Sequence, residues 1–301
     1  VVHSILYDED QKKAIGVRVI DSNLKTSQDY FAKVVFVSAS TLNTNLILLN
    51  SKSDRFPDGL GNDNGLLGKF IAFHNYRATI NAQFEGFPNY TTEGAKPTSH
   101  YVPRFRNIYR QETDFLRGYA AGFGAQPQRK TIRKGFGAEL TNQLLNSKET
   151  GFWNVNSHMM GETIPKSTNL VSLDPEKKDE WGIPLLNIDV DYDDNDEKMI
   201  QDFYEQFKEM YEKAGFVNIS INDNGRKPGN DIHEMGGVRM GKDPQTSLLN
   251  KWNQMHGCKN VFVTDGACMT STSTQNPSLT FMALSARAAN YAIQQMKKGL
   301  I

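Results

Sequence analysis

Two short, continuous apolar runs near opposite ends of the chain constrain the fold most strongly. One is VVFVS at residues 34–38, and the other lies in NVFVTDGA at residues 260–267. Strands buried on both faces of a parallel sheet have this composition. The first run ends in small residues and leads into TLNTNLILLNS, residues 41–51, which we expect to form a short helix. The two ends of the chain therefore predict an α/β portion.

The middle of the chain has a different pattern. Apolar and polar residues alternate in YRATINAQF (76–84), FWNVNSHMM (152–160) and LLNIDVDY (185–192). Such alternation is typical of antiparallel strands with one face in water. An amphipathic helix is predicted over residues 194–211, with Gly215 as its stop. The fold class is therefore α/β (α+β), with an antiparallel portion that interrupts the α/β portion.

Composition excludes several classes of partner. The chain has 301 residues with 34 basic and 34 acidic side chains, so its net charge gives no reason to expect nucleic acid or an anionic membrane as a partner. Cys258 and Cys268 cannot form a disulfide framework and are expected to be free thiols. No apolar run is long enough to cross a bilayer. The chain begins within a strand pattern, so we interpret it as part of a longer protein whose localisation stays undecided.

One histidine lies in an unusual context, DIHEMGGVRMG at residues 231–241. His233 and Glu234 resemble the start of a zinc-protease motif, but Gly237 occupies the position of the second histidine, and no metal site is predicted. A single histidine is most often structural. The adjacent glycines, however, allow the backbone to approach either a ligand or another strand closely. Both interpretations stay open on this evidence.

A carboxylate follows the second apolar run. Asp265 and Gly266 come directly after the predicted strand, at the edge of the sheet where α/β folds bind ligands. An Asp-Gly pair also suits a turn by its geometry alone. The sequence does not decide between a ligand site and a turn.

The final helix has a polar beginning and an alanine-rich body. Asn276 is expected to cap it and Pro277 to start it, with an end near residues 297–299. The free N–H groups near residues 278–280 then point out of the positive end of the helix dipole, which suits an electron-rich ligand atom. The predicted apolar stripe consists of Phe281, Leu284, Ala288, Tyr291 and Ile293.

Together these segments resemble the glucose-methanol-choline (GMC) family of flavin oxidoreductases over nearly the whole chain. The resemblance is carried by residues 231–241, by NQMHGCKNVFVTDGACM (253–269) and by TQNPSLTFMALSARAA (274–289), with support from AKVVFVSASTLNTNLILLNS (32–51) and GLLGKFIAFH (65–74). The chain is most similar to the branch of gluconate and sorbitol dehydrogenases, pyranose oxidases and glucoside 3-dehydrogenases.

The resemblance implies a glutathione-reductase-type FAD-binding domain with an inserted substrate domain. Residues 1–75 and 226–301 would belong to the FAD-binding domain, and residues 76–225 to an antiparallel substrate domain. The family's glycine loop for the nucleotide lies in an N-terminal segment that this chain lacks. Residues 38–40 read Ser-Ala-Ser where the family usually has alanine-glycine.

The resemblance also implies roles for individual residues. His233 would be the catalytic base, and Asn276 would hold the same alcohol hydroxyl in line for hydride transfer to FAD. The substrate would be a sugar or polyol, and Trp153 or His158 could lie near it, although core packing is the preferred interpretation for Trp153. The residues placed against FAD are Asp265, Gly266, Pro277, Ser278, Leu279 and Thr280.

Other functions stay open. The electron acceptor could be oxygen, a quinone or a cytochrome. The main alternative is a non-catalytic carbohydrate-binding or accessory module of the same fold, against which the presence of both His233 and Asn276 argues. A lyase or a choline-type oxidase is a weaker possibility.

Overall fold

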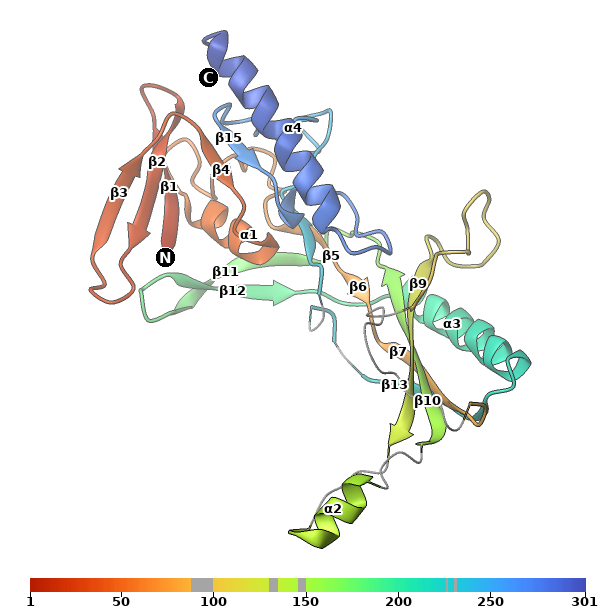
Figure 1. The fold of residues 1–301 in the computed structure, drawn as a ribbon. Coiled ribbons are helices and arrows are strands. Elements are labelled where there is room, and N and C mark those ends of the chain that lie inside the picture. Colours follow the sequence, from red (N-terminus) through yellow and green to blue (C-terminus); the bar gives the residue numbers. More distant parts are fainter. Residues whose placement is uncertain (88–99, 130–134, 146–149, 226, 230–231) are drawn as a thin grey trace. The chain divides into compact units, whose positions relative to one another are not determined.

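The computed structural model contains two compact units (Figure 1). Unit 1 comprises Val1–His74, Thr163–Asp191 and Ile232–Ile301, and unit 2 comprises Asn75–Glu162 and Tyr192–Asp231. The structure describes residues 1–87, 100–129, 135–145, 150–225, 227–229 and 232–301.

Unit 1 begins with a three-stranded antiparallel sheet. Its strands, in spatial order, are β1 (Val2–Asp8), β2 (Lys13–Ile20) and β3 (Ser27–Phe31). Strands β1 and β2 each bury part of their apolar side chains, but β3 is almost entirely exposed and has no apolar alternation. It forms because it pairs with β2, where Arg18 also makes an ion pair of 2.8 Å with Asp29.

The two apolar runs form a parallel pair, as predicted. Strand β4 (Val35–Val37) pairs in parallel with β15 (Val261–Val263), with Val35 opposite Val261. Helix α1 (Thr41–Asn50) follows β4, and the short 3₁₀ helix η1 (Gly266–Cys268) follows β15. The fold is therefore the mixed α/β arrangement that the sequence indicated.

A four-stranded sheet also belongs to unit 1. Its order is β12 (Pro184–Asp189), β11 (Leu170–Lys178), β5 (Lys69–Ala72) and β14 (Met235–Gly237). The sequence placed the alternating stretch around β12 in the inserted antiparallel portion. The structure groups it with unit 1 instead, because β12 pairs with β11, and β11 pairs with β5.

The last helix, α4 (Ser278–Lys297), packs through its alanines. Ala288 and Ala292 are buried and cluster with Phe262 of β15, whose ring is fully buried. Alanines four residues apart lie on one helix face, and their small side chains permit this close packing. Ile293 was predicted in the same stripe but is 51% exposed, because it lies one position further around the helix.

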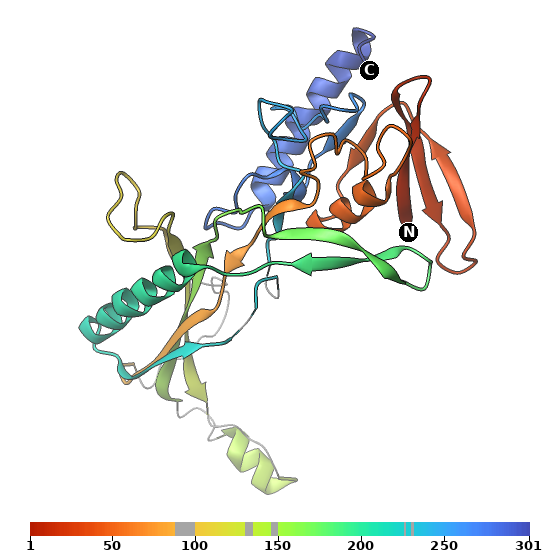
Figure 2. The same ribbon diagram turned by 180° about the vertical axis from the view of Figure 1, so that it is seen from behind.

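Unit 2 is built on a six-stranded antiparallel sheet (Figure 2). The two-residue strand β6 (His74–Asn75) also pairs with β10 (Thr150–Glu162). The other strands, in spatial order, are β13 (Val217–Asp223), β7 (Ala78–Phe84), β10 (Thr150–Glu162), β9 (Tyr119–Arg129) and β8 (His100–Val102).

One face of this sheet packs against helix α3 (Asp194–Lys213), which the sequence predicted. Met199, Phe203 and Phe207 are buried on it, on the face that meets the core side chains of the sheet. Asp193 caps its first turn through a capping box. The helix therefore supplies one side of the core of unit 2.

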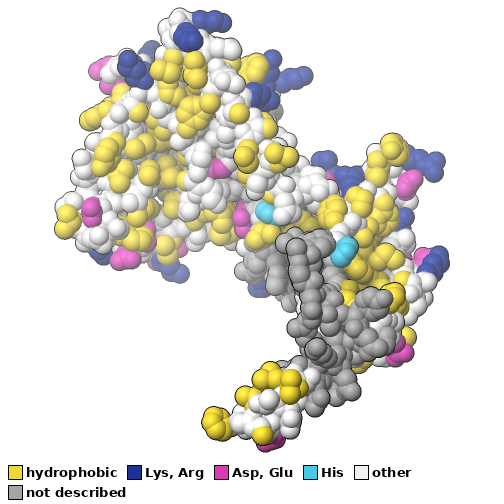
Figure 3. Space-filling model, in the orientation of Figure 1, with side chains coloured by type: hydrophobic (Ala, Val, Ile, Leu, Met, Phe, Trp, Pro, Cys, Tyr) yellow, Lys and Arg dark blue, Asp and Glu magenta, His cyan; other side chains and the backbone are white. Residues whose placement is uncertain are grey.

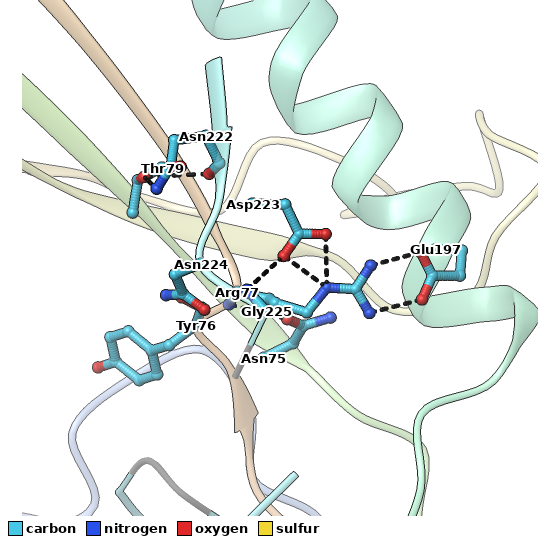
Figure 4. A network of polar contacts seen from close by, with 9 residues as sticks. All are labelled: Asn75, Tyr76, Arg77, Thr79, Glu197, Asn222, Asp223, Asn224 and Gly225. Atoms are coloured by element: carbon cyan, nitrogen blue, oxygen red, sulfur yellow. Dashed lines mark hydrogen bonds and ion pairs between the residues drawn. The ribbon is translucent and has the colours of Figure 1, made fainter. Parts of the chain in front are cut away.

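An ion-pair network fixes one end of that sheet (Figure 4). The guanidinium of Arg77 bonds both carboxylate oxygens of Glu197, at 2.6 and 2.7 Å, and its Nε donates to Asp223 at 2.9 Å. Arg77 is only 17% exposed, and the carboxylates of Glu197 and Asp223 raise its pKa above the ordinary value of an arginine. The network connects the start of β7 to the end of β13 and the first turn of α3.

The helix α2 (Ala138–Leu145) has no buried residue. Leu144 and Leu145 are 55% and 69% exposed, and Figure 3 shows hydrophobic side chains on its surface. Among the helices that the structure describes, none combines the length and apolar character that a membrane span requires.

Candidate active site

His233 lies just before β14 in a strained backbone conformation. Its φ angle is 71°, in the left-handed region that histidine adopts uncommonly. Its ring makes an edge-to-face contact with the fully buried His74, with ring centroids 4.9 Å apart. The Nδ1 atom of His233 is buried and has no hydrogen-bond partner within the described chain. Burial lowers the pKa of His233, which favours its neutral form.

The two glycines after His233 serve the packing of the protein itself. Gly236 and Gly237 have φ angles of 94° and 88°. A Cβ on Gly236 would overlap the carbonyl oxygen of Phe70 in β5, and a Cβ on Gly237 would overlap the side chain of Asn45 in α1. Of the two interpretations that the sequence left open, the close approach at these positions is therefore to a neighbouring strand and helix.

Asp265 also has partners within unit 1. The carboxylate is 9% exposed and accepts hydrogen bonds from the Thr44 hydroxyl and from the Ala267 N–H, the latter at 2.9 Å. Burial raises the pKa of Asp265, and these hydrogen bonds oppose the rise. Asp265 thus caps η1 and holds the start of α1 beside β15. The turn interpretation accounts for these contacts.

Gly266 brings three parts of the candidate site together. A Cβ at this position would overlap the Thr41 hydroxyl, would lie 2.7 Å from the carbonyl oxygen of Glu234, and would lie 3.4 Å from the Phe281 ring. Glu234 follows His233, and Phe281 lies in the first turn of α4. The absence of a side chain therefore lets η1 pack against both the histidine segment and the start of α4.

The beginning of α4 differs from the prediction. Pro277 is the N-cap residue, with φ −90° and ψ −8°, and no side chain caps the helix, so the expected cap by Asn276 is wrong. Pro277 has helix-like backbone angles and directly precedes Ser278, the first residue of α4. Asn276, the residue before Pro277, is exposed. Ser278, Leu279 and Thr280 are also exposed. Among the residues that the structure describes, no side chain accepts a hydrogen bond from the first N–H groups of α4, so these groups can donate to a ligand.

Several residues of this region were not singled out as site residues. Thr41, Thr44 and Asn45 are buried polar residues on one face of α1, and His74 contacts His233. Their signal in the sequence was the polar spacing within TLNTN, directly after a buried strand. That spacing puts the three side chains on one helix face. If this face is buried, its polar groups need hydrogen-bond partners elsewhere in the fold.

Sequence comparison relates this chain to a known family. The family model described as GMC oxidoreductase matches residues 165–285. A 2-methyl-1,2-propanediol dehydrogenase from Mycolicibacterium austroafricanum is 33% identical over 93% of this chain and 51% of its own length. A fructose dehydrogenase large subunit from Gluconobacter japonicus is 28% identical over 91% of this chain and 50% of its own length. The chain spans about half the length of these curated relatives.

Solved structures share the fold. A formate oxidase from Aspergillus oryzae superimposes with a TM-score of 0.66 at 12% identity, over 100% of this chain and 60% of that protein. A pyridoxine 4-oxidase superimposes with a TM-score of 0.55 at 15% identity, over 98% of this chain and 57% of that protein. Residues 165–285 carry the C-terminal part of a GMC oxidoreductase, and the chain belongs to the GMC oxidoreductase family.

Proposed function

We propose that this chain is the C-terminal half of an FAD-dependent oxidoreductase that oxidises a CH–OH group of a sugar or polyol by hydride transfer to the flavin. The observation that carries the proposal is His233, a half-buried histidine with a lowered pKa and a buried ring nitrogen without a partner in the described chain. It lies in a segment that packs through Gly266 against the first turn of α4.

The residues present fit FAD at the start of α4. Helix α4 has 20 residues, and no side chain of the described residues caps it. The free N–H groups at its start, near Pro277, Ser278, Leu279 and Thr280, and the positive end of its dipole therefore suit an anionic group. Bound FAD would supply the acceptor for the hydride. Two relatives support this cofactor: a gluconate 2-dehydrogenase of Pantoea cypripedii is named a flavoprotein, and the formate oxidase was studied for modification of its FAD.

The other side chains of the site have separate roles in the proposed reaction. A neutral imidazole can take the proton of an alcohol hydroxyl, and the lowered pKa keeps His233 neutral at physiological pH. The exposed amide of Asn276 can donate to the same oxygen and so orient the alcohol. Asp265 acts on this site by holding β15, η1 and α1 together, and Gly266 admits the close packing.

The proposal is tested by anaerobic reduction of the flavin in the full-length protein, with a panel of sugars and polyols. His233→Ala should slow reduction about 100-fold or more, the usual scale for the loss of a general base. His3→Ala is the matched control, because His3 is also partly buried in unit 1 with a lowered pKa. Near-normal reduction in His233→Ala would remove the histidine from this role.

Asn276→Ala separates orientation from cofactor binding. We expect it to slow reduction while the protein retains flavin, because the amide acts on the alcohol. A flavin-free product would assign Asn276 to the cofactor instead. A full-length protein without any flavin would contradict the oxidoreductase proposal and favour the non-catalytic carbohydrate-binding module.

A further inference from the structure

His74 ends the segment GLLGKFIAFH (65–74), and its side chain is fully buried in unit 1. The antiparallel ladder of β5 and β14 pairs Ala72 with Met235. The same register, continued two residues beyond this pair, brings His74 opposite His233. Their rings meet there, with centroids 4.9 Å apart and planes inclined by 88°. The two histidines, far apart in the sequence, are therefore a cross-strand pair.

Two buried threonines anchor the main chain beside this pair. The Thr41 hydroxyl donates to the carbonyl oxygen of Glu234, the residue after His233, at 2.5 Å. The Thr163 hydroxyl donates to the carbonyl oxygen of Phe73 at 2.7 Å, and the Phe73 N–H donates to the same hydroxyl at 3.1 Å. Both threonines are 3% exposed. Because buried hydrogen bonds are costly to break, the backbone on each side of the ring contact is held in place.

His233 depends on such support more than an ordinary strand residue does. Its φ angle of 71° belongs to a conformation that persists only where the surrounding structure holds it. Its imidazole is half-buried, and its Nδ1 atom has no hydrogen-bond partner within the described chain. Hydrogen bonding at that nitrogen therefore does not fix the orientation of the ring. The edge-to-face contact with His74 is the interaction that restricts rotation of this imidazole.

A pair of histidines can also bind a metal ion. Among the residues that the structure describes, no group of three or more His, Cys, Asp or Glu side chains is placed to hold one. The ring geometry is also unsuitable, because two metal ligands need their nitrogen lone pairs to converge on one point. An edge-to-face contact instead directs one ring at the face of the other, which carries no lone pair. The pair therefore suits packing of one ring by the other.

We propose that His74 is a positioning residue for His233, whose imidazole it holds in the orientation that accepts the proton of the alcohol. A general base has to lie within hydrogen-bond reach of that proton, and a misplacement of about 1 Å can slow a reaction about 100-fold. His74 acts only through His233 and touches no reacting atom. This inference rests on the proposed function for the role of His233, but the ring contact can be measured independently.

The kinetic test is anaerobic flavin reduction in the full-length protein. We expect His74→Ala to slow reduction about tenfold or more. His74→Phe keeps a ring and loses both ring nitrogens, so it should restore most of the rate. In a His233→Ala background, His74→Ala should cause no further loss, because its effect passes through His233. His256→Ala is the matched control, since His256 is a half-buried histidine of unit 1 that contacts Ser247.

A second readout does not depend on activity. In protein labelled with ¹³C-histidine, NMR can follow the ring signal of His233, assigned by its loss in His233→Ala. The signal should shift and broaden in His74→Ala, because the neighbouring ring no longer shields and confines it. It should stay sharp in His74→Phe. This measurement detects the ring contact even if His233 has no part in the reaction.

A change at Thr163 guards against a folding defect in the His74 variants. Thr163→Val removes both hydrogen bonds to Phe73 and leaves His74 itself unchanged, so it should slow reduction in the same direction as His74→Ala. Thr163→Ser keeps the hydroxyl and should retain the rate. Equal rates in the Val and Ser variants would contradict the anchoring of this contact.

The outcomes separate the inference from the proposed function. A wild-type rate in His74→Ala, a rate in His74→Phe as low as in His74→Ala, or a further loss in the His233→Ala background would overturn the inference. So would an unchanged His233 signal in His74→Ala. Near-normal reduction in His233→Ala, together with a His233 signal that responds to His74→Ala, would contradict the proposed function alone.

Discussion

Strand β14 of unit 1 and strand β9 of unit 2 both contain glycine, for opposite reasons. At Gly236 a left-handed backbone and the carbonyl oxygen of Phe70 exclude any side chain. At Gly124 no atom of the described residues lies within 4 Å of the position that a Cβ would occupy, so none of them requires glycine there. The first glycine is explained by packing beside His233, whereas no described neighbour requires the second. Glycine therefore has to be interpreted from its surroundings and not from its type.

Gly236→Ala should have the largest effect on stability. The left-handed backbone alone costs about 1–3 kcal/mol for a residue other than glycine, and the overlap with Phe70 adds to it. We expect a loss of about 3 kcal/mol or more, measured by urea unfolding with an unchanged m value. Gly65→Ala is a useful control, because Gly65 shares the positive φ but has nothing within 4 Å of the Cβ position. Equal losses at both positions would show that backbone conformation alone accounts for the effect.

Thr44→Val tests the polar packing next to that glycine strand. The variant removes the hydroxyl that donates to Asp265, and a hydrogen bond to a charged group contributes about 1.5–3 kcal/mol. Burial has already raised the pKa of Asp265 above its ordinary value, so its folded state favours protonation. The loss of stability should therefore be larger at pH 7 than at pH 4, where the carboxyl is increasingly protonated. A deficit that does not change with pH would separate Thr44 from the charge of Asp265.

The pH dependence of kcat/KM in the full-length enzyme examines His233 itself. The neutral imidazole is the active base, so the rate should fall as pH falls through the pKa of His233, about tenfold per unit below it. Because burial lowers this pKa, the fall should lie below pH 6.5. His233→Ala should lose this limb of the profile. A limb above pH 6.5 would contradict the effect of burial on this side chain.

Sequence patterns predicted those elements whose periodicity reflects burial. The parallel pair β4 and β15 and helix α3 were identified because apolar residues fill whole strands or one helix stripe. Strand β3 was missed because it is an exposed strand held by its pairing with β2, which leaves no apolar signal. The stretch around β12 was expected in the inserted portion, whereas the structure groups it with unit 1, since alternation indicates a strand but not its partner.

Only those site residues that lie in recognisable sequence motifs could be predicted. His233 and the start of α4 could be named from their motifs, and their roles as base and cofactor contacts stay predictions. The partners of Asp265 could not be foreseen, because Thr44 lies far away in sequence and meets it only through the pairing of β4 with β15. The contact of His74 with His233 likewise depends on β5 lying beside β14. Such contacts are properties of the fold and leave no local pattern.

Gly124→Ala is the smallest change and completes the comparison with Gly236. Alanine restricts the unfolded chain more than glycine does, and nothing opposes a Cβ at this position in the folded state. The variant should be about 0.5 kcal/mol more stable than wild type, measured by the same urea unfolding as Gly236→Ala. A clear destabilisation would mean that packing requires this glycine too.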